Sequence, residues 1–221
     1  MKKLFAILVL MGCLSRFNAH SQSCLLSYQN RMDELLPLTT LQKHYKADWS
    51  EATLNYKKSS KYPKYDTYEY SWKSGRIRKM TVAGREMNVP DDNRIGLAWI
   101  DEINPKYHPD PVKYFRNFYR TATKAEKQQA AALLDKKLKD KGVSSGEQAV
   151  SKQVGKTVMG SKGFEPITGV GDAAAWDLTS NQLVVLKGRT TFKVTANVDA
   201  DLKINQALAR KLAAEVLDRC R

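Results

Sequence analysis

The chain has 221 residues, of which 42% are hydrophobic and 27% are charged, and its 37 Lys and Arg against 23 Asp and Glu give a formal net charge of +14. This composition excludes a collagen, an intrinsically disordered protein and a small disulfide-dense scaffold. The length fits one domain with a single hydrophobic core.

Residues 1–21 have the pattern of a secretory signal. Lys2 and Lys3 precede the apolar run Leu4–Leu14, and a polar segment follows it. This run is much shorter than the roughly 20 residues that a membrane-spanning helix needs. The sequence therefore predicts an exported protein.

Two processing routes remain open. Small residues at Ala19 and Ser21 suit ordinary cleavage, whereas Leu10–Cys13 resembles a bacterial lipobox in which Cys13 would be lipidated. The first route gives a periplasmic or secreted protein, and the second anchors it to the envelope through lipid. Either way we expect residues 22–221 to form a single α+β domain.

Removal of residues 1–21 takes away three basic residues and no acidic ones, so the net charge falls from +14 to +11. Two cysteines then remain, Cys24 and Cys220. In an oxidising compartment we expect them to form a disulfide, with two free thiols as the alternative. No zinc site is expected, because His44 and His108 lack the paired spacing of zinc ligands.

The first half of the chain predicts a short helix followed by strands. Apolar residues in Leu25–Leu36 favour a helix before a proline. Residues 68–72 then alternate aromatic and polar side chains, which is typical of a half-buried strand. Two further strands are expected at Ile77–Val89 and Ile95–Ile103, with the turn-forming residues Pro90–Asn93 between them.

The middle of the chain predicts helices. A short helix is expected at Pro111–Tyr119, and a longer one begins at Thr123, where Glu126 three residues later completes a capping box. This second helix is expected to run to about Lys141. A further helix is expected from Ser145 to about residue 158.

The last third predicts a hairpin and a terminal helix. Strands at Leu183–Lys187 and Thr191–Val198 flank a turn at Gly188 and Arg189. Asp199 or Asp201 is expected to cap the helix that follows. A four-residue apolar repeat marks the buried face of that helix, at Ile204, Leu208, Leu212, Val216 and Cys220.

Three segments together resemble a known family. Gly169–Trp176, Leu183–Gly188 and Ala209–Ala213 are similar to the C-terminal part of small bacterial secreted or lipid-anchored proteins of the PsbP/Mog1-like type, over about 55 residues, and Cys24–Leu26 is similar to their start. The resemblance implies an α/β/α sandwich, an antiparallel sheet flanked by helices. It implies no catalytic residue.

One motif suggests an enzyme. Gly142–Gly146 matches the G-x-S-x-G pattern of a serine nucleophile, with Ser144 at its centre. A buried strand should precede such a serine, but here a charged helix end does. His44 and His108 also come before Ser144, whereas the motif's histidine should follow it. We therefore expect no enzyme, and a hydrolase using Ser144 is kept as an alternative.

Other motifs that bind small groups are incomplete. Gly169, Gly171 and Ala174 fit G-x-G-x-x-A, but the sequence indicates neither a strand before this motif nor a long helix after it. Gly155–Thr157 lacks the first glycine of a phosphate loop, and Asp91–Asn93 is better explained as a turn than as a calcium loop. We expect no cofactor and no metal.

Aromatic and basic residues gather in residues 43–85, which contain 11 Lys or Arg and 4 acidic residues among eight Tyr and Trp. Rings beside cations can stack on sugars or bases and attract anions. A strand whose aromatic face is core and whose lysines are solvated is the alternative. The candidate binding surface comprises Lys57, Lys58, Lys61, Tyr62, Lys64, Tyr65, Arg76, Arg78, Lys187 and Arg189.

These observations favour a monomeric binding module of the cell envelope whose partner is an acidic protein or another anionic component. An immunity or inhibitor protein that neutralises a toxin or enzyme is the alternative. Nucleic acid is disfavoured as a partner, because an exported protein rarely meets it. The membrane is expected to be a partner only through a lipid on Cys13.

Overall fold

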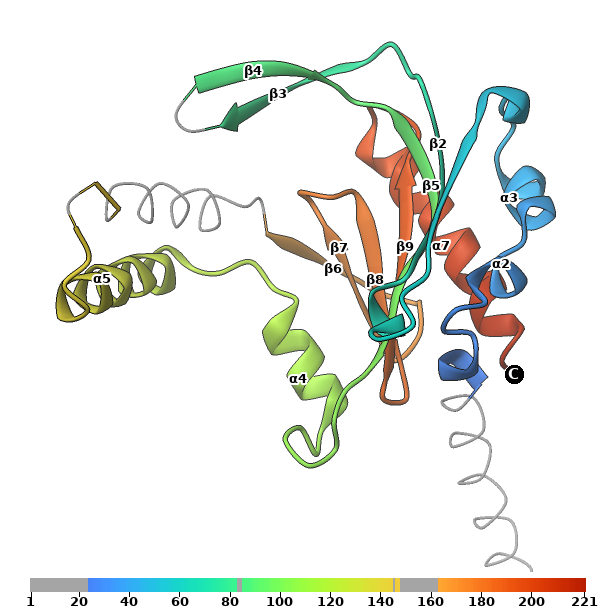
Figure 1. The fold of residues 1–221 in the computed structure, drawn as a ribbon. Helices are drawn as coiled ribbons and strands as arrows, with labels where there is room; N and C mark the ends of the chain where they lie inside the picture. The colour runs from blue at the N-terminus through green and yellow to red at the C-terminus, as the bar shows by residue number, and fades with distance from the viewer. Residues whose placement is uncertain (1–23, 83–84, 145, 148–162) are drawn as a thin grey trace, which may run out of the picture.

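The computed structural model describes residues 24–82, 85–144, 146–147 and 163–221 (Figure 1). The strands are β1 (Thr53–Lys57), β2 (Thr67–Trp72), β3 (Ile77–Val82), β4 (Arg85–Pro90), β5 (Asn93–Glu102), β6 (Phe164–Ile167), β7 (Ala173–Asp177), β8 (Gln182–Lys187) and β9 (Thr190–Asn197). The helices are α2 (Met32–Leu35), α3 (Leu38–His44), α4 (Pro111–Phe118), α5 (Lys124–Asp140) and α7 (Leu202–Asp218), with short 3-10 helices η1 (Trp49–Glu51) and η2 (Pro63–Tyr65).

Seven strands form one sheet in the order β1-β2-β5-β9-β8-β7-β6, and every neighbouring pair is antiparallel. Helices lie on both sides of it (Figure 1). The predicted α+β class, an antiparallel sheet flanked by helices, is confirmed. The predicted hairpin is also confirmed, because β8 and β9 pair directly around Gly188 and Arg189.

The main hydrophobic core lies on the face of the sheet that meets α7, called here the core face. Phe192, Val194 and Ala196 project from β9 into this core, and the buried side chains of α7, α2 and α3 cover them. Alternation along β9 thus places its apolar residues on the core face and its polar residues on the opposite face.

The apolar repeat of α7 is confirmed except at its first position. Leu208, Leu212 and Val216 are buried, whereas Ile204 is 47% exposed. A step of four residues advances about 40° beyond one full turn, so a four-residue repeat drifts around the helix. Ala209 and Ala213 complete the buried face instead.

Cys24 and Cys220 form the predicted disulfide, with their Cα atoms 5.6 Å apart and a sequence separation of 196. Cys220 is buried at the end of the face that α7 turns to the core. The bond therefore joins the first described residue to the turn that directly follows α7. It fixes the N-terminal helices against the core face.

The opposite face of the sheet, called here the open face, is covered over β7 and β8 by α4. Phe115 of α4 packs with Ala175, Val184 and Leu186 in a second, smaller core. Asp110 caps this helix by accepting a hydrogen bond from the backbone N–H of Lys113 at 2.9 Å. The prediction of a helix at Pro111–Tyr119 is confirmed to within one residue.

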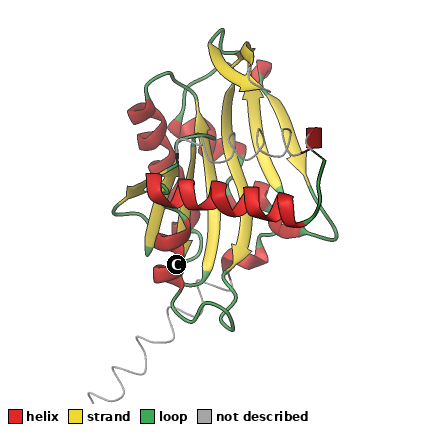
Figure 2. Cartoon of the chain, turned by 90° about the vertical axis from the view of Figure 1, so that its left-hand side faces the viewer, coloured by secondary structure: helices red, strands yellow, loops and turns green. Residues whose placement is uncertain are grey.

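Helix α5 begins at the predicted capping box, in which the Thr123 hydroxyl and the Glu126 carboxylate each bond the other residue's backbone N–H. It has no buried residue and projects away from the sheet on the open-face side (Figures 1 and 2). None of the helices within the described ranges is long and apolar enough to cross a membrane.

Two predicted elements are divided. The predicted helix Leu25–Leu36 is interrupted at residues 28–31, where Asn30 has a left-handed φ of 65°, and only short helical segments form on either side. The predicted strand Ile77–Val89 is divided into β3 and β4, which pair antiparallel with each other. Residues 148–158 of the predicted helix at Ser145 lie outside the described residues.

Removal of the disulfide by Cys24→Ala together with Cys220→Ala should lower the free energy of unfolding by about 2–5 kcal/mol. The bond closes nearly the whole described chain, and a cross-link over a long loop restricts the unfolded ensemble strongly. Urea denaturation under non-reducing conditions measures the difference. An unchanged midpoint would show that the terminal bond adds nothing.

Candidate functional site

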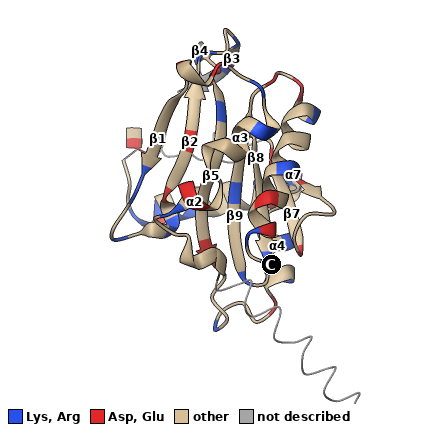
Figure 3. Ribbon diagram, turned by 90° about the vertical axis from the view of Figure 1, so that its right-hand side faces the viewer, with Lys and Arg blue, Asp and Glu red and all other residues tan. Residues whose placement is uncertain are grey.

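Six of the sequence-predicted site residues lie together at one edge of the sheet. They belong to the segment from the end of β1 to η2, residues 57–65, called here the Lys-Tyr loop, and are Lys57, Lys58, Lys61, Tyr62, Lys64 and Tyr65. Figure 3 shows basic residues at the end of β1 and in the loop after it, whereas α7 carries both basic and acidic residues.

Three lysines of the Lys-Tyr loop lie over tyrosine rings. The distances from Nζ to the ring centroid are 4.1 Å for Lys58 on Tyr56, 5.2 Å for Lys61 on Tyr62 and 5.1 Å for Lys64 on Tyr65. Such contacts hold cations beside flat apolar surfaces. Among the described residues no ion pair neutralises Lys57, Lys58 or Lys61, and all three are exposed.

The aromatic residues that follow this loop have a different role. Tyr68 is buried on the core face, and Tyr70 and Trp72 pack against the same core. Burial raises the pKa of the Tyr68 phenol well above its usual value, and the hydrogen bond to Tyr70 adds to the rise. The aromatic residues are therefore divided: Tyr62 and Tyr65 are exposed in the Lys-Tyr loop, whereas those before and after the loop pack in or against the main core.

Arg76 and Arg78 lie at the far end of the sheet, away from the Lys-Tyr loop. The guanidinium of Arg76 is partly buried and donates hydrogen bonds to Asn93 Oδ1 at 2.7 Å and to Asp91 Oδ2 at 3.4 Å. Arg78 is exposed on β3. Arg76 thus fixes the base of the β3-β4 hairpin.

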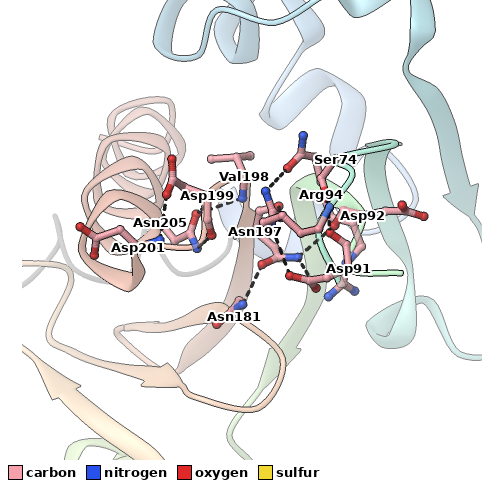
Figure 4. A network of polar contacts seen from close by, with 12 residues as sticks. Ser74, Asp91, Asp92, Arg94, Asn181, Asn197, Val198, Asp199, Asp201 and Asn205 are labelled. Atoms are coloured by element: carbon pink, nitrogen blue, oxygen red, sulfur yellow. Dashed lines mark hydrogen bonds and ion pairs between the residues drawn. The ribbon is translucent and has the colours of Figure 1, made fainter. Parts of the chain in front are cut away.

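The same base is held by Asn197 of β9. Its amide donates to Asp91 Oδ1 at 3.1 Å and to the Asp92 carbonyl at 3.0 Å, and its oxygen accepts from Asn181 at 2.7 Å (Figure 4). Asn205 on α7 continues the network by accepting the backbone N–H of Val198 at 2.9 Å. The aspartates between β4 and β5 are thereby engaged in structural contacts.

Lys187 and Arg189 lie in and beside the turn between β8 and β9. Lys187 pairs with Asp172 at 3.1 Å. Arg189 donates to three backbone carbonyls, those of Ile103, His108 and Pro109. Arg189 therefore holds the segment after β5 in place, and this segment forms part of a pocket.

The glycine pattern beside Asp172 forms a tight turn. A Cβ on Gly171 would lie 2.4 Å from the Leu186 carbonyl oxygen, and its φ of 59° favours glycine. The Asp172 carboxylate accepts the backbone N–H of Gly188 at 2.6 Å. The expectation that no strand precedes this motif is wrong, because β6 does; β7 follows it in place of a helix.

A pocket of about 320 Å³ opens on the open face, next to the Lys-Tyr loop. At its centre is Trp99, which sits at an irregularity in β5 between Ala98 and Asp101. An inserted residue shifts the alternation of a strand and redirects side chains. Ile100 consequently enters the main core, whereas the Trp99 indole is 43% exposed and its backbone has a left-handed φ of 54°.

Lys193 on the neighbouring strand β9 supplies the charge of the pocket. Its Nζ lies 3.8 Å from the centroid of the Trp99 ring. The side chain is half-buried, and burial lowers the pKa of its ammonium while the more distant Asp177 opposes the shift. In the described part of the chain this ammonium has no ion-pair partner.

The walls of the pocket come mainly from η2, from α4 and from the segment after β5. From η2, Tyr65 meets Trp99 edge-on at 5.3 Å between centroids. From α4, Tyr114 stacks on His108 at 3.7 Å and on Phe118 at 5.6 Å. The chain brings polar groups to the same space, and these are Lys64, Asp101, Glu102, Asn104 and Thr191.

Two of these polar groups neutralise each other. Lys64 Nζ lies 3.4 Å from Asp101 Oδ2, and this carboxylate raises the pKa of the Lys64 ammonium. Deeper in the pocket, burial raises the pKa of Tyr119 to about 12, so its hydroxyl keeps its proton at neutral pH. Lys193 thus lies beside the Trp99 ring without an ion-pair partner among the described residues, while the second carboxylate that lines the pocket, Glu102, is engaged in a contact of its own.

Sequence analysis missed Trp99, Lys193 and the aromatic residues of α4. The sequence predicts a strand at Trp99 but does not indicate that an irregularity in this strand exposes the side chain. The alternation of β9 does place Lys193 on the face opposite Phe192 and Val194. Nothing in the sequence indicates that β9 pairs with β5 and so brings Lys193 to Trp99.

The structure gives little support to the other chemistries. The Ser144 hydroxyl donates to Glu147 Oε2 at 2.7 Å and accepts the Glu147 backbone N–H, which is a helix-capping arrangement. His44 contacts Glu215 at 2.7 Å, on the core-face side of the molecule. No group of three or more potential metal ligands occurs among the residues described.

No family model, no curated protein and no solved structure matches this chain.

The Arg76→Ala variant should lower the free energy of unfolding by about 1–3 kcal/mol, because it leaves partly buried acceptors without their donor. The matched Arg78→Ala variant removes an exposed guanidinium from the same hairpin and should change stability by less than about 0.5 kcal/mol. Urea denaturation of both compares them. Equal losses would contradict the structural role of Arg76.

The Lys193→Met variant should be at least as stable as the parent at neutral pH, because the half-buried ammonium loses hydration on folding. Since the folded state releases this proton before the unfolded state does, the parent gains stability relative to the variant as pH rises towards 10.5. Urea denaturation at both pH values measures the difference. A variant that is less stable at neutral pH, by an amount independent of pH, would contradict this account.

Proposed function

We propose that this chain is an exported binding module of the cell envelope that engages an anionic macromolecule through the Lys-Tyr loop. The observation that carries the proposal is the cluster of exposed lysines without ion-pair partners in the described chain, Lys57, Lys58 and Lys61, at one edge of the sheet. Closely spaced cations attract polyanions, and neighbouring rings add apolar contact.

The disulfide between Cys24 and Cys220 supports the cellular location, because such bonds persist in oxidising compartments outside the cytosol. Together with the signal pattern of residues 1–21 it favours a periplasmic or secreted protein, or one anchored by lipid on Cys13. The resemblance to PsbP/Mog1-like proteins belongs to the same proposal, and the fold that it implies agrees with the observed sheet.

An immunity or inhibitor protein is the second candidate, since the same lysines could dock on an acidic protein. The Lys-Tyr loop presents them on a rigid frame, because η2 packs against β5 and the buried Asp66 accepts the Ser59 backbone N–H at 2.7 Å. A rigid loop is suited to protein recognition as well. A hydrolase using Ser144 is less favoured, because the hydroxyl is engaged in a helix cap.

Reversal of three loop charges tests the proposal. The Lys57→Glu, Lys58→Glu, Lys61→Glu variant should bind soluble polygalacturonate at least about tenfold more weakly than the parent at low salt. The matched control, Lys136→Glu, Lys203→Glu, Lys211→Glu, has the same net charge and should lose much less. Fluorescence anisotropy of labelled polymer gives both affinities.

The affinity of the parent should also fall steeply when salt shortens the Debye length to a few ångströms. Equal weakening in both triple variants would show that only net charge matters, and the Lys-Tyr loop would then lose its assigned role. Binding to an acidic protein fraction of the envelope, but to no acidic polymer, would favour the immunity or inhibitor candidate instead.

A further inference from the structure

The pocket beside the Lys-Tyr loop contains side chains that the core does not require. Trp99, Tyr65 and Phe118 are 43%, 49% and 59% exposed, and all three line the same space. Large aromatic residues normally bury most of their surface. Their gathering in one concave site indicates a surface that is kept available for a ligand.

The backbone of β5 also directs Trp99 away from the core. A regular strand would direct Trp99 to the core face after Ile95 and Leu97, but the irregularity sends Ile100 there instead. Trp99 is thereby held with a φ of 54°, a conformation that non-glycine residues rarely adopt. Its backbone N–H donates to the Asp66 carbonyl at 3.0 Å, which anchors it beside the Lys-Tyr loop.

Lys193 defines the charge of the ligand. Its ammonium lies 3.8 Å from the Trp99 ring centroid, has lost part of its hydration and has no ion-pair partner in the described chain. The neighbouring carboxylate of Asp101 is already paired with Lys64. An anionic group that approaches along the Trp99 face would meet the ammonium of Lys193, and a charge-assisted hydrogen bond would form.

The other residues that line the pocket indicate which uncharged part of the ligand would fit it. The exposed surfaces of Trp99, Tyr65 and Phe118 suit the apolar C–H face of a sugar ring. The Asp101 carboxylate, the Asn104 amide and the Thr191 hydroxyl offer the donors and acceptors that sugar hydroxyls need. A volume of about 320 Å³ is at the small end of ligand pockets, which fits one ring.

We propose that this pocket binds a uronic acid residue, with its carboxylate bound by Lys193 and the sugar ring packed against the exposed aromatic side chains that line the pocket. This inference rests on the proposed function in one respect, since such a sugar could be part of the anionic polymer that the Lys-Tyr loop attracts. The residues that support the pocket assignment are different from the lysines that support the proposed function. The pocket selects a single acidic ring, and the loop attracts a chain of charges.

Titration of the disulfide-bonded protein with free galacturonate and with galactose tests this assignment. Ligand-observed saturation-transfer NMR measures the two affinities. Galacturonate should bind at least about fivefold more tightly than galactose, because only the acid forms the charge-assisted bond with Lys193. A galacturonate trisaccharide distinguishes a free sugar from the end of a polymer, since tighter binding of the trisaccharide indicates the polymer.

Two variants separate the roles of ring and charge. Lys193→Met should abolish the preference for galacturonate over galactose, because only galacturonate loses a charge-assisted bond, and the exposed Lys203→Met, which should keep that preference, is its control. Trp99→Asn should weaken both sugars by at least about fivefold. Asparagine is chosen because it tolerates the left-handed backbone at this position. Tyr107→Asn, at an exposed tyrosine outside the pocket lining, is the matched control.

Three results would overturn the assignment: no saturable binding of galacturonate by the parent, equal binding of galacturonate and galactose, or tighter binding of benzoate than of galacturonate. The charge-reversed Lys-Tyr loop variant should retain its affinity for free galacturonate. A parent protein that binds free galacturonate but not polygalacturonate would overturn the proposed function alone, and a parent that binds the polymer but not the free sugar would overturn the pocket assignment alone.

Discussion

Burial of the core face against α7 and the N-terminal helices is the interaction on which the rest of the structure depends. The five inner strands, β2, β5, β9, β8 and β7, place apolar side chains on this face, and Leu208, Leu212 and Val216 of α7 cover them. The bond between Cys24 and Cys220 then holds both ends of the chain at the same side of the sheet. Because this side supplies the main core, the other side is free to carry polar and exposed aromatic residues.

The open face carries residues of both kinds. Among the elements that the structure describes, α4 seals the β7-β8 part of this face through Phe115. Beside that seal, β5 and β9 present Trp99 and Lys193 next to each other, while Arg189 fixes the segment that carries His108. A pocket thus arises where a covered part of the sheet meets an uncovered part, and the Lys-Tyr loop borders it from the β1-β2 edge.

Two features of this pocket oppose stability. Trp99 occupies a left-handed backbone conformation and exposes apolar surface, and Lys193 keeps its charge in a place where burial lowers its pKa. Strained backbone and desolvated charge often accompany binding sites, since the surrounding fold must compensate for them. Arg76, by contrast, is a partly buried basic residue whose guanidinium donates hydrogen bonds to Asp91 and Asn93. Its role in the basic segment is therefore structural.

The sequence by itself determined the α+β class, the hairpin of β8 and β9, the capping box of α5 and the pairing of the two terminal cysteines, because each depends on local periodicity, local capping residues or cysteine count. It also indicated the Lys-Tyr loop, whose lysines and tyrosines are adjacent in the chain. It could not divide residues 77–89 into a hairpin, nor separate the structural Arg76 from the exposed Arg78. Only the tertiary structure decided the pocket, since the pairing of β5 with β9 joins residues nearly a hundred positions apart and a single irregularity in β5 decides which way Trp99 points.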